Sequence, residues 1–292
     1  MSTAETPEWV NPSWLLTVPN RLELCATRWR VTIGERLGLG NTSRVFSCAD
    51  DRGSCVDDRG RNLVLKLAPA EMRPELEAAA LMVWEGRGSV RLIAFELEAG
   101  ALLLERLVPG TALPPLDDAA ATELVAPPLL ALHNARFDGT RAFPTQREFL
   151  DVWLAWARKS AENGTAGLRL LDRAYQTARA LCSDRTPLVL LHGDFIDKNL
   201  LLDGRGYVAV DPIPRIGDAC SDVGFYSAYH PRARDIARRA RLLAARCGLD
   251  TERAASWAAV WAVGEATETW RPDSDELQRW VQSGEAANLL AR

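Results

Sequence analysis

Two short segments of the sequence place oxygen-bearing side chains just after apolar runs. Asp194 and Asn199 follow the apolar run 188–191. Asp211 follows a second apolar run at 207–210. Carboxylate and amide oxygens are ligands that suit Mg²⁺, and a carboxylate can also orient an attacking hydroxyl and accept its proton. Phosphoryl transfer depends on such positioning and charge neutralisation, so the two segments indicate that chemistry.

A glycine-bearing turn at 38–43 offers a place for phosphate groups in the first third of the chain. Gly40 would let the backbone approach a phosphate, and the Ser43 hydroxyl could donate to it. Alone, such a turn is equally typical of an ordinary hairpin. Lys66 lies in the apolar segment 63–68, where a lysine needs an anion as its partner, and triphosphate oxygens would serve.

The segment 63–66 resembles the V-A-I-K strand of kinases, and this resemblance implies that a glutamate from a helix orients Lys66. Two candidates follow it in the sequence. Glu75 and Glu77 differ by about 200° around a helix axis, so one should face the lysine and the other solvent. Counting back from Trp84 favours Glu77. Glu75 stays open as the alternative, because the loop after Lys66 could shift the register.

The elements that must position these side chains are predicted from residue patterns. Before residue 108, apolar alternation or clustering predicts five strands, at 29–37, 44–49, 63–68, 90–96 and 101–107. A helix rich in alanine, leucine and glutamate is predicted at 75–85. Beyond a hinge at Pro109-Gly110, helical patterns predominate, at 117–135, 146–160, 168–182 and 233–292. The runs 188–191 and 207–210 predict a small two-stranded platform.

The predicted fold class is therefore α+β, with two parts. Residues 1–108 would form a β-rich N-terminal lobe that binds nucleotide. Residues 109–292 would form a mainly helical C-terminal lobe that carries the catalytic and substrate-binding groups.

The motif H-G-D-x-x-x-x-N at 192–199, followed by a strand and Asp211-Pro212, resembles the aminoglycoside phosphotransferase family, which is related to protein kinases. Within that family the chain looks most like the streptomycin 6-phosphotransferase and hydroxyurea phosphotransferase branch. The segments 217–224 and 81–92 also match, and the likeness extends over nearly all of the chain beyond residue 29. It implies a protein-kinase-like bilobal fold, with ATP and Mg²⁺ as cofactors.

The resemblance also assigns roles by position. Asp194 would be the catalytic base, and Asn199 and Asp211 would hold the metal. His192 and Asp222 would brace the catalytic loop rather than touch substrate.

The segment 102–108 looks like the strand that leads into the hinge. Backbone groups of Glu105 and Leu107 would hold the adenine there.

Two residues of the catalytic loop depart from the family pattern. Ile196 stands where a histidine is common, and Lys198 stands where a small residue is common. Lys198 could neutralise the γ-phosphate or could be an ordinary solvated side chain, and both interpretations stay open. Neither departure removes a carboxylate or a metal ligand.

The acceptor would be chosen by the helical lobe. Acidic side chains gather near Trp270, and we take Glu265, Glu268 and Asp273 as candidates for a cationic substrate. An amphipathic core helix with an acidic solvent face explains them equally well. Trp257, Trp261 and Trp270 are more typical of a core than of a ligand platform.

Composition narrows the class of protein. The 292 residues carry 35 basic and 39 acidic side chains, a net charge of -4, which does not suit a nucleic-acid partner. No apolar run approaches the ~20 residues that span a bilayer, and the first residues do not resemble a secretory signal. Six cysteines without metal-binding spacing fit reduced thiols. We expect a cytoplasmic monomer that binds a small molecule.

The leading hypothesis is an ATP- and Mg²⁺-dependent O-phosphotransferase that acts on a streptomycin-like aminoglycoside. GTP is not excluded as the donor. A kinase of the same fold could instead act on hydroxyurea, another sugar or a metabolic alcohol. A reading from another class is a nucleotide-binding regulatory protein without turnover, which the presence of all four polar groups at 66, 194, 199 and 211 argues against.

Overall fold

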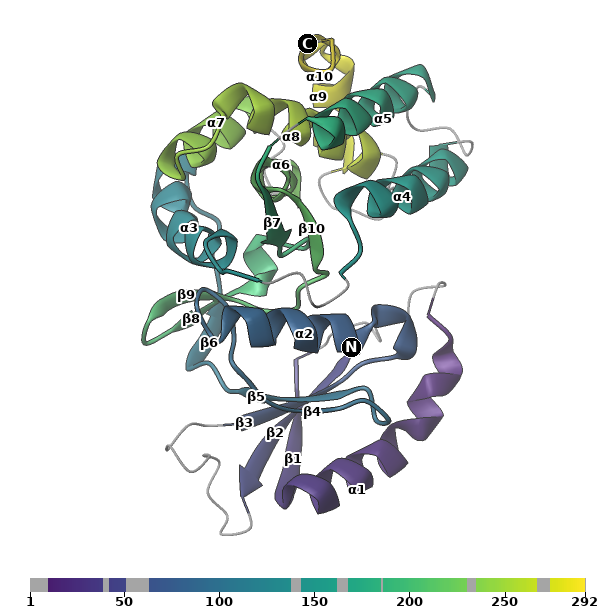
Figure 1. Ribbon diagram of the computed structural model, residues 1–292, viewed down its shortest axis with the longest axis vertical. Helices are drawn as coiled ribbons and strands as arrows, with labels where there is room; N and C mark the ends of the chain where they lie inside the picture. The colour runs from purple at the N-terminus through teal and green to yellow at the C-terminus, as the bar shows by residue number, and fades with distance from the viewer. Residues whose placement is uncertain are drawn as a thin grey trace. The chain divides into compact units, whose positions relative to one another are not determined.

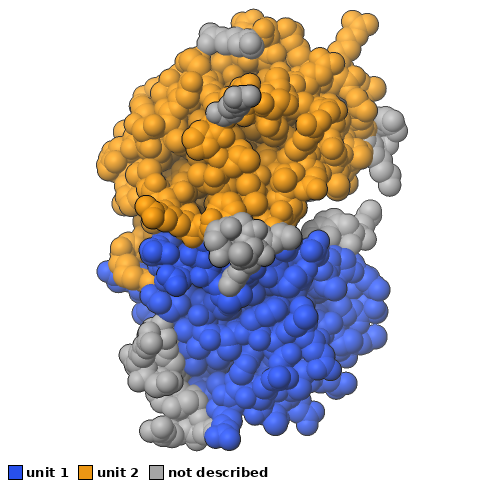
Figure 2. Space-filling model, in the orientation of Figure 1, with its two compact units in different colours: residues 1–111, 202–204 blue, residues 112–201, 205–292 orange. Residues whose placement is uncertain are grey.

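The computed structural model describes most of the chain, in eight stretches. They are residues 10–38, 42–50, 63–137, 143–161, 168–184, 186–229, 235–266 and 274–291. The chain divides into two units, which are coloured separately in Figure 2. The first unit comprises residues 1–111 with 202–204, and the second comprises residues 112–201 with 205–292.

A five-stranded antiparallel sheet forms the framework of the first unit (Figure 1). In spatial order its strands are β1 (Val31–Leu37), β2 (Arg44–Asp50), β3 (Leu63–Leu67), β5 (Ala101–Glu105) and β4 (Leu92–Glu96). All five strands predicted before residue 108 are confirmed, with shifted ends. The register places Lys66 of β3 opposite Val45 of β2 and Leu102 of β5.

Helices lie along both sides of this sheet (Figure 1). The predicted helix is α2 (Pro74–Trp84), and a short 3₁₀ turn, η2 (Ala70–Met72), precedes it. On the other side lie η1 (Pro12–Thr17) and α1 (Val18–Trp29). The expectation that a strand begins at Trp29 was wrong, because Trp29 ends α1. Arg30 then takes a left-handed backbone with φ 51°, which terminates the helix before β1 begins.

Two small sheets belong to the part of the chain that carries the candidate catalytic residues. β7 (Leu188–Leu191) pairs antiparallel with β10 (Arg215–Asp218). β6 (Pro109–Ala112), β8 (Leu200–Asp203) and β9 (Gly206–Ala209) form a three-stranded sheet in the order β6-β8-β9. The predicted platform, which paired 188–191 with 207–210, was therefore wrong. β8 and β9 are joined by a two-residue turn, so β9 pairs with the strand that directly precedes it. β7 pairs instead with β10, which is more distant in the sequence.

Helices make up the rest of the second unit. They are α3 (Asp118–His133), α4 (Gln146–Ala161), α5 (Leu168–Ser183), η3 (Asp197–Asn199), α6 (Ala219–Tyr229), α7 (Ile236–Arg246), α8 (Thr251–Glu265), α9 (Ser274–Gln282) and α10 (Glu285–Leu289). The three helices predicted between 117 and 182 are confirmed. Trp257 and Trp261 of α8 are fully buried, so the core interpretation of these two tryptophans is confirmed.

The architecture is α+β, with strands predominating in the first unit and helices in the second, as predicted. Within the described residues, every helix is too short or too polar to cross a bilayer.

Candidate active site

The loop that follows β7 carries Asp194, and Asn199 closes this loop on itself. Asn199 is buried at the end of η3. Its Nδ2 group donates to the backbone carbonyl of Asp194 at 2.9 Å and to Asp194 Oδ2 at 2.8 Å. Both bonds use the amide nitrogen, so the amide oxygen is the atom that could serve a cation. The arrangement fixes the Asp194 carboxylate and directs a neutral oxygen beside it.

A second carboxylate, that of Asp211, acts electrostatically on Asp194. Burial raises the pKa of Asp194 to about 6, against the opposing charge of Lys198 and with the support of the like charge of Asp211. A divalent cation bound by Asp211 would offset the repulsion that Asp194 experiences from this like charge.

The side chains available as ligands suit Mg²⁺ better than they suit a metal ion that is bound by protein side chains alone. Among the described residues, no three histidine, cysteine, aspartate or glutamate side chains converge in a way that would hold a metal ion. Mg²⁺ usually binds through one or two carboxylates together with substrate phosphates and water. Asn199 and Asp211 therefore fit an ion that arrives with a triphosphate.

Asp211 has an unusual backbone. It follows β9 by two residues and has φ of 62°, in the left-handed region. The next residue is Pro212, and a residue before proline is normally extended. A left-handed backbone at a residue other than glycine costs on the order of 1–3 kcal/mol and persists where the surroundings enforce it. Such strained residues cluster at functional sites.

Asp222 braces the loop from the first turn of α6. Its Oδ2 accepts from the backbone N–H of His192 at 2.9 Å, and its Oδ1 accepts from that of Gly193 at 3.0 Å. Burial acts to raise the pKa of Asp222, but the hydrogen bond and charge of His133 hold this pKa below its ordinary value. The carboxylate thus stays ionised and holds two successive peptide groups.

His192 fills the interior of the same loop. The side chain is fully buried, and this burial lowers the pKa of His192 to about 4 despite the nearby charge of Asp222. Its Nδ1 accepts from the backbone N–H of Asp194 at 3.3 Å. A neutral imidazole in this place supports the loop backbone, which agrees with the structural role expected for His192.

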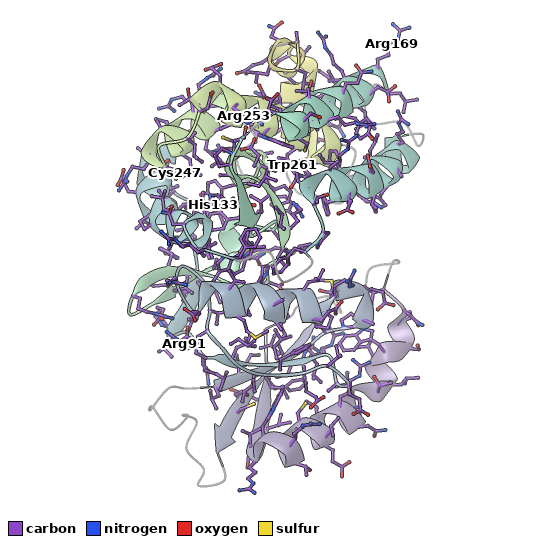
Figure 3. The ribbon with its side chains drawn as sticks, in the orientation of Figure 1. Arg91, His133, Arg169, Cys247, Arg253 and Trp261 are labelled. Atoms are coloured by element: carbon purple, nitrogen blue, oxygen red, sulfur yellow. The ribbon has the colours of Figure 1, made fainter. Side chains whose placement is uncertain are left out.

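His133 was not singled out from the sequence, where nothing connects it to Asp222, 89 residues later. It lies at the end of α3 (Figure 3), and its Nε2 is 2.9 Å from Asp222 Oδ2. Both side chains are buried. The pair links α3 to the residue that holds the backbone of the loop at 192–193.

Replacing His133 with alanine should therefore destabilise the protein. A buried carboxylate would lose one of its three partners, at a cost of about 1–3 kcal/mol in the free energy of unfolding. Urea denaturation would measure this loss. His133→Gln, which keeps a donor on a side chain of similar length, should recover part of it. Equal stability of His133→Ala and the unmodified protein would contradict the bracing interpretation.

In the first unit, Lys66 forms a buried ion pair. Its Nζ lies 2.8 Å from Glu77 Oε1 and 2.6 Å from Oε2. Lys66 is 5% exposed and Glu77 is 4% exposed. Glu75, on the opposite face of α2, instead bonds to Arg73 at the surface. Of the two candidate glutamates, Glu77 is thus the partner of Lys66.

The glycine-bearing turn is described only in part. Gly40 lies outside the described residues. Ser43 is buried, and its hydroxyl has no hydrogen-bond partner among the residues that the structure describes. A buried hydroxyl without a partner is costly, so a ligand oxygen at this place would be favourable.

Glu105 and Leu107 lie at and just after the end of β5, and both are buried. The backbone N–H of Glu105 donates to the carbonyl of Arg91 at 3.1 Å. In return, the N–H of Arg91 donates to Glu105 Oε1 at 2.9 Å. Any contact of the Glu105 backbone with a base would thus have to use its carbonyl.

The candidate substrate residues are only partly described. Glu265 ends α8 and is 5% exposed, so it does not belong to an ordinary acidic solvent face. Glu268, Trp270 and Asp273 lie outside the described residues. Lys198 is exposed and acts electrostatically on Asp194, which leaves both interpretations of this lysine open.

Comparisons with known proteins connect these features to one group. Residues 28–273 match a family model described as aminoglycoside/hydroxyurea antibiotic resistance kinase. The chain is 32% identical over 246 residues to the hydroxyurea phosphotransferase of Kitasatospora aureofaciens, which covers 82% of this chain and 69% of that protein. It is 25% identical over 277 residues to the streptomycin 6-kinase of Streptomyces glaucescens, which covers 84% and 80%.

A solved structure shows the same fold. A choline/ethanolamine kinase family protein from Mesorhizobium loti matches with a TM-score of 0.66 and 18% identity, over 94% of this chain and 98% of that one. The predicted protein-kinase-like fold is confirmed.

Proposed function

This chain belongs to the aminoglycoside/hydroxyurea antibiotic resistance kinase family, and from that premise we propose that it transfers the γ-phosphate of ATP to a hydroxyl of a streptomycin-like aminoglycoside. The resemblance inferred from its motifs is thereby confirmed at the level of the family and its branch. The observation that carries the proposal is the position of Asp194, whose carboxylate and backbone are both held by Asn199.

In this proposal the second unit performs the chemistry. Asp194 orients the acceptor hydroxyl and takes its proton as the phosphoryl group moves. Asn199 and Asp211 would hold Mg²⁺, which would neutralise charge on the phosphates. Asp222, His192 and the backbone between them keep the base in place, because a loose transition state depends on positioning.

The first unit would hold the nucleotide. Lys66, kept in place by Glu77, contacts phosphate oxygens, and the turn containing Gly40 and Ser43 covers them. The carbonyl of Glu105 and the backbone of Leu107 contact the base. The ion pair of Lys66 with Glu77 supports this assignment, because it holds the ammonium group in one place, where a phosphate oxygen could bind it.

Ser43 offers a direct test of the phosphate contact. Ser43→Ala should raise the KM for ATP by about 3- to 10-fold, the loss expected for one neutral hydrogen bond. The matched control is Ser47→Ala in the same strand region, because the half-buried Ser47 already has a partner: its hydroxyl donates to the Glu35 carbonyl at 3.3 Å. Steady-state kinetics with varied ATP would measure both. An identical KM in the two variants would remove Ser43 from the nucleotide site.

The identity of the acceptor is inferred from the candidate substrate residues and from the relatives. A cationic amino or guanidino sugar would suit the acidic candidates Glu265, Glu268 and Asp273. Hydroxyurea is the second candidate acceptor, because the relative named for it has the higher identity, 32% against 25%. We expect the protein to act on either as a monomer.

A transfer assay separates these alternatives. Purified protein would be incubated with Mg²⁺, γ-labelled ATP or GTP, and a panel containing streptomycin, other aminoglycosides, hydroxyurea and simple sugars. Label transferred to streptomycin supports the proposal, and label on hydroxyurea alone supports the second candidate. Nucleotide binding without transfer to any member of the panel would instead support a regulatory protein.

A further inference from the structure

Arg215 is a buried charged residue that none of the proposed catalytic roles uses. It is the first residue of β10 and is 2% exposed. Arginine is almost never fully buried unless it is paired. The contacts of this side chain therefore need an explanation.

Each nitrogen of the guanidinium group donates to a neutral oxygen. Nε donates to Gln146 Oε1 at 2.8 Å, and Nη2 donates to the backbone carbonyl of Gly193 at 3.0 Å. Nη1 has a longer contact, 3.4 Å, with the carbonyl of Ile213. Gln146 is itself buried and is the first residue of α4. The side chain thus joins the start of α4 to the residue that precedes Asp194.

Aromatic rings hold the guanidinium plane. Its central carbon lies 3.8 Å from the centroid of the Phe149 ring and 5.7 Å from that of Trp261. Trp261, labelled in Figure 3, is fixed in turn by a bond from its Nε1 to the Ser221 carbonyl at 3.1 Å. A cation over an aromatic ring is favoured when it is desolvated, and the Phe149 ring lies close enough to restrict the guanidinium group.

The charge is balanced by carboxylates of the same loop region. Burial lowers the pKa of Arg215 to about 10, while the charges of Asp222 and Asp194 act to raise it. Arg215 is therefore a cation at neutral pH. It is held beside two anions without a direct ion pair to either in the described residues.

The peptide groups around Gly193 are held from both sides. Asp222 accepts the N–H groups of His192 and Gly193. Ile213 donates to the His192 carbonyl at 2.9 Å, and Arg215 donates to the Gly193 carbonyl. Gly193 has φ of 78°, and a Cβ there would lie 2.0 Å from the Ile213 carbonyl oxygen. No side chain could fit between the loop and its anchor.

We propose that Arg215 is a positioning residue for phosphoryl transfer, which anchors the Gly193 carbonyl and so fixes the backbone that carries Asp194 relative to α4. Asp222 holds the N–H side of the same peptides, and Arg215 completes the support on the carbonyl side. The effect on catalysis rests on the proposed function, whereas the anchoring of the loop does not.

Hydrogen exchange tests the anchoring without any assay of activity. In Arg215→Met, which keeps the bulk and removes the donors, the amides of residues 192–194 should exchange on the order of tenfold faster or more, as expected for loss of a charge-assisted bond. Arg215→Lys, which keeps the charge but not the fork of donors, should show a smaller increase.

Arg253 provides the matched control. It lies in α8 (Figure 3) and donates to Asp218, Asp184 and the Leu181 carbonyl, with no bond to residues 192–199. Arg253→Met should lower stability and leave loop exchange unchanged at an equal folded fraction. Should Arg215→Met fail to fold, Gln146→Leu keeps the cation, removes its Nε acceptor, and should raise loop exchange in the same direction.

Steady-state kinetics of the same variants provide a second test of the proposal. With the acceptor identified by the transfer assay, Arg215→Met should lower kcat about 10- to 100-fold with little change in the KM for ATP, and Arg215→Lys should recover part of the loss. Loop exchange or kcat no different from that of Arg253→Met would overturn the proposal. If the unmodified protein transfers phosphate to no acceptor, the proposed function fails, and the exchange arm still decides whether Arg215 anchors the loop.

Discussion

Asp194→Asn is expected to lower the rate of phosphoryl transfer by on the order of 10²–10⁴-fold, because the amide cannot accept the proton of the acceptor hydroxyl. The substitution keeps the shape of the side chain and an oxygen that can accept from Asn199 Nδ2, so the loop should stay folded. The result to measure is kcat at saturating ATP and acceptor, beside the binding of ATP. We expect kcat to fall while ATP still binds.

A surface carboxylate of the same unit serves as control. Asp184 bonds to Arg253, and more than half of its side chain is exposed. Asp184→Asn should change activity by no more than about twofold, in line with most surface substitutions. A rate for Asp194→Asn that equals the rate of this control would exclude Asp194 as the base.

Glu77→Gln is expected to have the largest effect on stability. It removes the carboxylate that pairs with the buried ammonium of Lys66, and breaking a buried pair from one side costs about 3–5 kcal/mol. The same change lets Lys66 move away from the position in which it would contact phosphate. We therefore expect both a lower free energy of unfolding and a higher KM for ATP.

The same helix provides a control of the same chemistry. Glu75→Gln alters a surface contact with Arg73, and surface substitutions usually change the free energy of unfolding by less than about 0.5 kcal/mol. Denaturation and ATP titration of both variants give the comparison. If Glu75→Gln proves as damaging as Glu77→Gln, the buried pair is not what stabilises α2 against β3.

Features set by local sequence were predictable. The five strands before residue 108 and the helix at 74–84 follow from residue periodicity alone. The choice of Glu77 over Glu75 follows from the geometry of one helix, since two residues turn the side chain to the opposite face. The loop at 192–199 could be recognised in the sequence because its motif residues lie within eight positions of one another, and the catalytic roles of these residues stay predictions.

Features set by distant partners were not predictable. β10 has the sequence Arg-Ile-Gly-Asp, whose polar ends and glycine give no pattern typical of a strand, and its pairing with β7 depends on tertiary structure. α1 was missed because no residue of a recognised motif marks it. His133 contacts Asp222 across 89 positions, and Gln146 contacts Arg215 across 69. Histidine and arginine in a helix or strand give no sign of which buried group they will meet.

The left-handed backbone at Asp211 sets two requirements of the protein against each other. Glycine adopts such a φ without steric cost, so a glycine here would relieve the strain but remove the proposed metal ligand. Asp211→Gly should therefore keep or raise thermal stability while it removes the proposed metal ligand, so that stability and Mg²⁺-dependent turnover would change in opposite directions at this one position.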